Sequence, residues 1–209
     1  MKTENDRSLI IFARYPRAGE VKTRLGAGIG MAEAAKVYKQ LAEHVFEIGK
    51  EMEKTGIRVW LFYDPSASEQ EMRAWVGQEF VFCPQEGSNL GERMHNAFRR
   101  TFAGGSSRSI IVGTDIPNLE AAVITEAFDL LELDEVVLGP SEDGGYYLLG
   151  MIDGVGDLFS GIAWSTPDVF PATLARVRGL KLRHSLLATL ADIDTKEDLV
   201  RFSAWFGKS

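Results

Sequence analysis

The sequence has a single cysteine and no long hydrophobic run, and these two absences exclude several classes of protein. Cys83 alone cannot form an internal disulfide or a cysteine-based zinc cluster, so we expect it to be a small buried apolar residue. The apolar run near the N-terminus, Leu9–Ala13, is too short for a signal peptide or a membrane span. We therefore expect a cytoplasmic protein with no membrane span.

Positive charge is also scarce. The chain carries 23 Lys and Arg against 30 Asp and Glu, which gives a formal net charge of −7. This balance argues against nucleic acid as a partner, because nucleic-acid-binding domains are usually basic. The 209 residues, 45% of them apolar and 25% charged, are typical of one globular domain, which we expect to span 1–209. Nothing in the composition predicts an oligomeric state.

Several catalytic motifs are missing. No Gly-x-Ser-x-Gly sequence occurs, and the three histidines, His44, His95 and His184, form no recognisable triad pattern. The glycines in 26–30 do not have Gly-x-Gly-x-x-Gly spacing and do not directly follow a predicted strand. The sequence therefore disfavours acyl-transfer hydrolysis and a nicotinamide cofactor.

The chain does contain short apolar strands that alternate with amphipathic helices. Strands are predicted over 8–13, 57–63, 80–83, 110–113, 135–139 and 180–187, and helices over 31–54, 89–102 and 168–177. The six residues 140–145 cannot hold a crossover helix, so the strand at 146–150 should return antiparallel. We predict an α/β fold with a mixed, mostly parallel central sheet.

Side chains that favour helix starts accompany several of these elements. A helix N-cap is a Ser, Thr, Asp or Asn, and an acidic residue three positions later completes a capping box. We expect such starts at Ser66 with Glu69, Asn89 with Glu92, Asn118, and Thr195 with Asp198.

Charged residues follow the predicted strands, where ligands bind in open α/β sheets. The set is Arg14, Lys22, Arg24, Asp115, Asp143, Asp192 and Asp194. Carboxylates without His or Cys favour hard cations such as Mg²⁺ or Mn²⁺, and nearby cations neutralise substrate phosphates. The pattern indicates transferase chemistry on a nucleotide. For Asp115, which follows the central strand, the alternative is an ordinary turn residue.

Six motifs occur in an order that resembles a known bacterial family. They are 12–16 (FARYP), Gly19 with 21–25 (VKTRL), 89–94 (NLGERM), 113–117 (GTDIP), 139–147 (GPSEDGGYY) and 164–166 (WST). They resemble largely uncharacterised proteins classed as nucleotide-diphospho-sugar transferases of the GT-A superfamily. The match covers nearly the whole chain and implies a three-layer, Rossmann-like GT-A fold.

Two segments are also similar to nucleotidyltransferases. Residues 22–25 (KTRL) resemble the first loop of 2-phospholactate guanylyltransferases, and 192–195 (DIDT) are similar to the tail of cytidylyl- and guanylyltransferases. That resemblance implies Asp115 as the first metal ligand and Asp194 or Asp192 as the second. The paired-glycine loop of nucleotidyltransferases is absent, and 14–17 (RYPR) stands in its place.

These observations lead to three hypotheses. The first is a metal-dependent glycosyltransferase that uses a nucleotide-diphospho-sugar donor and a small-molecule acceptor. The second is a nucleotidyltransferase that joins a nucleoside triphosphate to a phosphorylated small molecule and releases pyrophosphate. The third is a nucleotide-binding module without catalysis.

The resemblance, together with the placement of these residues after the predicted strands, assigns roles in such a site. Catalytic roles are implied for Asp115, Asp143 and Lys22. Nucleotide binding is expected for Ala13, Arg14, Lys22, Arg24, Gln85, Gly87, Arg93 and Thr114. Substrate binding is expected for Gly144, Gly145, Tyr146, Trp164, Ser165 and Thr166.

Overall fold

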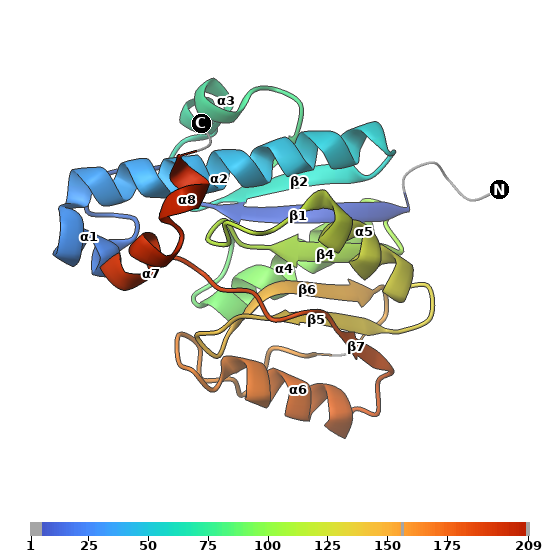
Figure 1. Cartoon of the computed structure of the whole chain (residues 1–209). Coiled ribbons are helices and arrows are strands. Elements are labelled where there is room, and N and C mark those ends of the chain that lie inside the picture. The colour runs from blue at the N-terminus through green and yellow to red at the C-terminus, as the bar shows by residue number, and fades with distance from the viewer. Residues whose placement is uncertain (1–5, 156, 208–209) are drawn as a thin grey trace.

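The computed structural model describes residues 6–155 and 157–207. Within them, seven strands form one sheet (Figure 1). The strands are β1 (Arg7–Ala13), β2 (Arg58–Tyr63), β3 (Val81–Pro84), β4 (Arg108–Val112), β5 (Val136–Pro140), β6 (Tyr146–Ile152) and β7 (His184–Leu186). Their order is β3-β2-β1-β4-β6-β5-β7, and only β6 runs antiparallel to its neighbours. The mixed, mostly parallel α/β fold is thereby confirmed.

Helices cover both faces of this sheet and make three layers. They are α1 (Thr23–Ile29), α2 (Met31–Lys54), α3 (Glu69–Val76), α4 (Leu90–Ala103), α5 (Ala121–Leu130), α6 (Val169–Gly179), α7 (Lys196–Arg201) and α8 (Ser203–Phe206). One core cluster joins α2, α3 and α5 to the sheet, and a second joins α4 and α6 to its other face. None of the described helices is long and apolar enough to cross a membrane.

The central strands β1, β2 and β4 are apolar after their first one or two residues, which suits a sheet that is covered on both faces. In β1, Leu9 and Ile11 belong to the first core cluster, and Ile10 belongs to the second. Alternate side chains of a strand point to opposite faces, so a strand with two buried faces needs apolar residues at every position. In β1 the run Leu9–Ala13 meets that requirement, after Arg7 and Ser8 at the start of the strand.

Helix α2 has the bounds that the periodicity predicts, and its inward face carries Leu41, Val45 and Met52. Two of the predicted helix starts are wrong. The capping box of α3 is Ser68 with Glu71, two residues beyond the predicted Ser66 and Glu69. Helix α5 begins at Ala121 after Glu120, without a side-chain cap, so Asn118 is not its N-cap.

Of the other two predicted capping boxes, one forms in part and one forms completely. Asn89 caps α4 by accepting from the Glu92 N–H, but the Glu92 carboxylate accepts from Ser88 and not from Asn89. Thr195 and Asp198 form the full reciprocal box that opens α7. The strand predicted over 180–187 is only three residues long, because the turn that ends α6 takes up its first residues: Lys181 has φ 58° and the Leu182 N–H donates to the Val177 carbonyl.

A third small cluster lies beneath the C-terminal helices, where Leu25, Leu41 and Ile193 are fully buried. It packs the end of the chain against α1 and α2, as Figure 1 shows by the red helices beside the blue ones. The fold therefore brings residues 190–194 across the sheet towards the end of β4.

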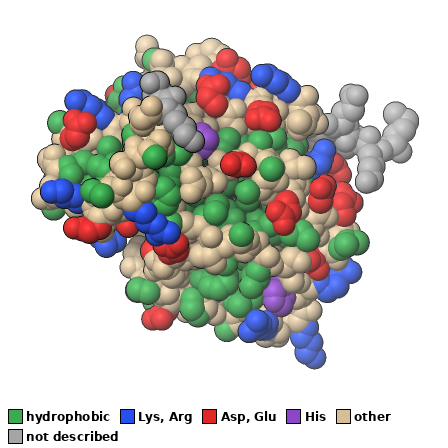
Figure 2. Space-filling view, viewed as in Figure 1, with side chains coloured by type: hydrophobic (Ala, Val, Ile, Leu, Met, Phe, Trp, Pro, Cys, Tyr) green, Lys and Arg blue, Asp and Glu red, His purple; other side chains and the backbone are tan. Residues whose placement is uncertain are grey.

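On the face drawn in Figure 2, charged side chains of both signs are interspersed around a central apolar area.

Candidate functional site

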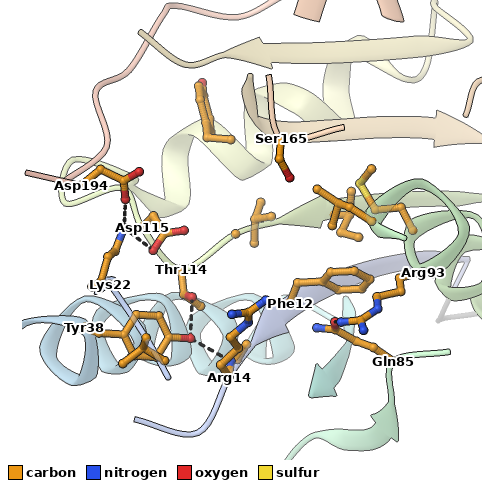
Figure 3. Close-up of a pocket in the computed structure, with 18 of the residues that line it drawn as sticks. Phe12, Arg14, Lys22, Tyr38, Gln85, Arg93, Thr114, Asp115, Ser165 and Asp194 are labelled. Atoms are coloured by element: carbon orange, nitrogen blue, oxygen red, sulfur yellow. Dashed lines mark hydrogen bonds and ion pairs between the residues drawn. The ribbon is translucent and has the colours of Figure 1, made fainter. Parts of the chain in front are cut away.

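A cavity of about 650 Å³ opens at the carboxyl ends of β1 and β4 (Figure 3). This volume lies within the range of small-molecule sites. Eleven residues with a predicted role line it: Ala13, Arg14, Lys22, Arg24, Gln85, Arg93, Thr114, Asp115, Tyr146, Ser165 and Asp194. They come from segments far apart in the sequence, which the sheet brings to one edge.

At one end of the cavity, the Lys22 ammonium lies between two carboxylates. Its Nζ is 2.7 Å from Oδ1 of Asp115 and 2.7 Å from Oδ1 of Asp194. The Lys22 side chain is only 5% exposed, while the two aspartates are 46% and 33% exposed. Arg24 reaches Asp194 Oδ2 at 3.3 Å from the solvent side.

Backbone contacts explain this convergence. Asp115 follows β4, and its carbonyl accepts a hydrogen bond from the N–H of Ile193, which places Asp194 beside it. Lys22 is the N-cap of α1 with φ 46° and ψ 46°, in the left-handed region that residues other than glycine rarely adopt. Lys22 lies in the chain between buried Val21 and Leu25, and its own side chain is also almost completely buried.

The charges at this end depend on one another. Burial acts to lower the pKa of Lys22, but Asp115 and Asp194 outweigh it and raise that pKa above its ordinary value. The lysine therefore stays protonated, and it screens the two carboxylates from each other.

Tyr38 connects the two loops that carry these charges. Its hydroxyl accepts from the Arg14 N–H at 2.8 Å and lies 3.1 Å from the Thr114 hydroxyl. Burial, with the nearby Asp115 carboxylate, raises the pKa of Tyr38 to about 12. The neutral Tyr38 side chain thus links the loop after β1 to the loop after β4 by hydrogen bonds.

At the other end of the cavity, Arg93 is fixed by three acceptors. Its guanidinium donates to Asp64 Oδ2 at 3.0 Å, to Gln85 Oε1 at 3.2 Å and to the Gly87 carbonyl at 3.3 Å. The Gln85 amide nitrogen donates to the Phe62 carbonyl, which orients the amide so that its oxygen faces Arg93. This end offers a positioned arginine next to the ring of Phe12, as Figure 3 shows.

Ser165 reaches the cavity from a loop with a strained backbone. Its φ is 64°, which is uncommon for a residue with a side chain. The neighbouring Trp164 packs directly on Gly91, where an added Cβ would lie 2.4 Å from the indole. An added Cβ at Gly144 would likewise lie 2.2 Å from the Pro167 carbonyl oxygen. These two glycines let the loop approach closely and hold Ser165 in place.

The other predicted residues lie outside the lining of the cavity: Gly87, Asp143, Gly144, Gly145, Trp164, Thr166 and Asp192. The Asp143 carboxylate accepts from the Ser141 hydroxyl and from the Gly145 N–H in its own turn. Burial, with the charges of Asp143 and Asp194, raises the pKa of Asp192 to about 6.

The carboxylates at the lysine end fit a hard divalent cation whose coordination shell is completed by substrate oxygens. Two carboxylate oxygens, from Asp115 and Asp194, converge on one point, which the Lys22 nitrogen marks. Among the described residues, no group of three carboxylate, imidazole or thiolate side chains could hold a metal ion. Mg²⁺ is typically bound through one or two carboxylates, waters and substrate phosphates, so two aspartates are sufficient.

The fold is a transferase-like α/β fold, and the family can be stated as well. The chain belongs to the family described as "Uncharacterized protein conserved in bacteria (DUF2064)", whose model matches residues 28–166. Among curated proteins there is no significant match.

Three solved structures illustrate what the fold resembles. A "putative nucleotide-diphospho-sugar transferase" from Desulfovibrio desulfuricans G20 is 28% identical, with 98% of each chain covered and a TM-score of 0.85. CMP:2-keto-3-deoxy-manno-octonic acid synthetase complexed with CTP is 14% identical, with 97% of this chain and 99% of that chain covered and a TM-score of 0.58. Rv0371c complexed with manganese, from Mycobacterium tuberculosis H37Rv, is 14% identical, with 94% and 97% covered and a TM-score of 0.54.

Two features of the site, the position of Tyr38 and helix α1 with Lys22 at its start, are not predicted from the sequence. Tyr38 lies on the inward face of α2, where helical periodicity predicts only that a residue is buried. Helix α1 was not predicted, because Gly26 and Gly28 lower helix propensity. A basic segment after a strand was the available signal for Lys22, but it does not reveal that the lysine turns inward.

Proposed function

We propose that the protein is a metal-dependent transferase that uses a nucleotide-diphospho-sugar donor. One observation carries this proposal: Lys22, Asp115 and Asp194 converge at one end of a cavity that also holds Arg14 and Arg24. Cations beside paired carboxylates suit a diphosphate with a divalent cation. The similarity to the Desulfovibrio protein supports the choice of donor.

In this proposal, Arg14, Lys22 and Arg24 bind the diphosphate and offset its charge. Asp115 and Asp194 hold Mg²⁺ or Mn²⁺, with Asp194 preferred over Asp192 because only Asp194 shares Lys22 with Asp115. A divalent cation bound there would act as a Lewis acid that stabilises the departing nucleoside diphosphate. Tyr38 keeps the two charged loops in register by its bonds to Arg14 and Thr114.

The Arg93 end would receive the nucleoside. It lies at the far side of the cavity from the carboxylates, and it combines the Phe12 ring with arginine N–H donors (Figure 3). Because Arg93 is held by Asp64, Gln85 and Gly87, its remaining donors are oriented before a ligand arrives. A keto oxygen or ring nitrogen of a nucleobase is a suitable acceptor for them.

The acceptor molecule would bind beside Ser165 and Tyr146, which also line the cavity. Trp164, Thr166, Gly144 and Gly145 would act indirectly, by fixing the loop that presents Ser165. The Asp143 carboxylate accepts from Ser141 and Gly145, so we propose that it stabilises this turn and does not transfer a proton.

Cys83 is a buried free thiol, and we propose a cytoplasmic location.

A second candidate is a nucleotidyltransferase, and the number of cations favours it. Three cationic side chains, from Arg14, Lys22 and Arg24, line one cavity, which suits a triphosphate at least as well as a diphosphate. The chain also shares its fold with a synthetase that was crystallised with CTP.

Product analysis separates these candidates. The protein would be incubated with Mn²⁺, a panel of nucleotide sugars or nucleoside triphosphates, and a panel of small-molecule acceptors that includes phosphorylated ones. Transfer of the sugar to an acceptor would be monitored by release of the nucleoside diphosphate, with Asp115→Asn as the control. The proposal expects release from one donor class by the wild type alone. Release of pyrophosphate from a nucleoside triphosphate would establish the second candidate. Nucleotide binding without either product would indicate a non-catalytic module and contradict both.

A further inference from the structure

Lys22 differs from every other cation of the cavity in how completely it is enclosed. Its side chain is 5% exposed, whereas Arg24, two residues later, is 72% exposed and meets the same Asp194. Lys22 also contacts both carboxylates at 2.7 Å, while Arg24 contacts Asp194 alone at 3.3 Å. The two residues carry the same charge beside the same site, but only Lys22 occupies its centre.

The backbone maintains this position at a cost. Lys22 has φ 46°, a left-handed geometry that is unfavourable for a residue with a side chain. Buried Val21 and Leu25 on either side hold the segment, and the Lys22 carbonyl accepts from the Gly26 N–H. In the ligand-free protein the enclosed ammonium therefore has a defined position between the two carboxylates, unlike a free surface lysine.

The position of Nζ has a direct consequence for metal binding. The Oδ1 atoms of Asp115 and Asp194, which both touch Nζ, are the atoms that would hold a divalent cation. An ammonium and a metal ion cannot share that point, since both are positive and both need the same oxygens. A divalent cation must therefore compete with Lys22.

Lys22 cannot leave the carboxylates without another anion. A buried charge that loses its partners is strongly unfavourable, so the ammonium needs a new partner when it moves. The phosphates of a nucleotide would supply this anionic partner, because Arg14 and Arg24 line the same cavity and make it suitable for anions.

We propose that Lys22 is a built-in counter-cation that occupies the divalent-cation site until a phosphate-bearing ligand draws it away. Metal and phosphate then bind cooperatively: the metal replaces Lys22 between the carboxylates, and the phosphate replaces the carboxylates around Lys22. This inference rests on the proposed function, and it adds the reason that the free protein should bind metal weakly.

The test measures the binding of Mn²⁺ alone to the free protein. Binding is monitored as the loss of the electron paramagnetic resonance signal of the free ion. We compare the wild type with Lys22→Met, and Arg24→Met is the matched control because it removes an equal charge beside the same Asp194. We expect Lys22→Met to bind Mn²⁺ at least about tenfold more tightly than the wild type, because a competing charge has gone. We expect Arg24→Met to stay within about threefold of the wild type, because exposed ion pairs are weak.

The proposal is overturned if Lys22→Met binds Mn²⁺ no more tightly than the wild type, or if Arg24→Met gains as much as Lys22→Met. Circular dichroism establishes that each variant is folded. If Lys22→Met does not fold, the wild type still provides a test, since inorganic phosphate should tighten its Mn²⁺ binding by reciprocal coupling. No effect of phosphate would then overturn the proposal.

These measurements use neither nucleotide nor turnover, so they fail separately from the proposed function. A wild type that binds Mn²⁺ as tightly as Lys22→Met would remove the counter-cation role and leave the transferase intact. A protein that shows the predicted Mn²⁺ behaviour but turns over no donor would contradict only the transferase.

Discussion

The two ends of the cavity hold their arginine and lysine in different ways. At one end, Lys22 is 5% exposed and is balanced by two carboxylates, Asp115 and Asp194. At the other end, the Arg93 side chain is 26% exposed, and it pairs with one carboxylate, Asp64, and also donates to the amide oxygen of Gln85 and to a backbone carbonyl. The first arrangement balances charge, while the second orients hydrogen-bond donors.

This difference indicates what each end can bind. With Arg24 included, two positive and two negative side chains meet at the Lys22 end, so this end can exchange one ion for another and suits a metal with phosphate. A site with oriented donors recognises shape and acceptor positions, so the Arg93 end suits a nucleoside. Variants at the two ends should therefore affect different properties, and the predictions below run from the largest expected effect to the smallest.

The largest effect is expected at Asp115. Asp115→Asn should lower turnover by at least about 100-fold, because it removes half of the carboxylate pair that would hold the metal. Asp194→Asn should behave alike, since both aspartates touch the same Nζ. Steady-state kinetics at saturating Mn²⁺ would measure this, with exposed Asp129→Asn on α5 as the control. Turnover within threefold of the wild type would contradict the metal assignment.

A smaller and different effect is expected at Arg93. Arg93→Met should weaken nucleotide binding by about tenfold, which is the value of one or two hydrogen bonds from a charged donor, and should leave the Mn²⁺ dependence unchanged. Isothermal titration with the nucleotide would test this, and Arg99→Met, an exposed position on the same α4 helix, is the matched control. If Arg93→Met changed the Mn²⁺ affinity instead, the two ends would not be distinct.

Tyr38→Phe examines the link between the charged loops. We expect the free energy of unfolding to fall by about 1–2 kcal/mol, because the Arg14 N–H and the Thr114 hydroxyl lose a buried partner. Urea denaturation would measure the loss. Unchanged stability would mean that other groups satisfy both polar atoms.

The mildest effect concerns Glu71, which anchors the loop that carries Lys22. Hydrogen bonds from the Ser68 N–H and hydroxyl, and then from Arg17, lower the pKa of Glu71 from 4.5 to about 2. Its ionised form therefore stabilises the fold above pH 4.5, and this contribution is lost as the pH falls towards 2. Glu71→Gln should melt at a lower temperature than the wild type at pH 7, and the gap should narrow below pH 4.5. A gap independent of pH would contradict this account of Glu71.

The sheet and the longest helix could be predicted from sequence because their signals are local. A strand covered on both faces is apolar throughout, and α2 repeats its apolar residues at helical spacing. The start of α3 was misplaced because the pattern Ser-x-x-Glu occurs twice, at Ser66 and at Ser68. The second is selected by tertiary contacts, in which Arg17 pairs with Glu71 and also donates to the Ser66 carbonyl.

The site was predictable only where a strand end positions the residue. Asp115 and Arg14 follow parallel strands, so their common edge follows from topology. Asp194 lies on a segment without a strand of its own, and the hydrogen bond from Ile193 to the Asp115 carbonyl is what places it. The inward turn of Lys22 depends on its unusual φ, for which the sequence carries no signal.

The central claim is that one cavity binds a nucleotide together with a divalent cation, and thermal unfolding tests it most directly. The wild type and Asp115→Asn would be melted against nucleoside triphosphates, nucleoside diphosphates and nucleotide sugars, each with and without Mn²⁺. A ligand at 100 times its Kd adds about 2.7 kcal/mol, which raises the midpoint of a protein of this size by roughly 5–11 °C. We predict such a shift with a nucleotide sugar, only with Mn²⁺ and only in the wild type. No shift with any nucleotide, or an equal shift in Asp115→Asn, would contradict the claim.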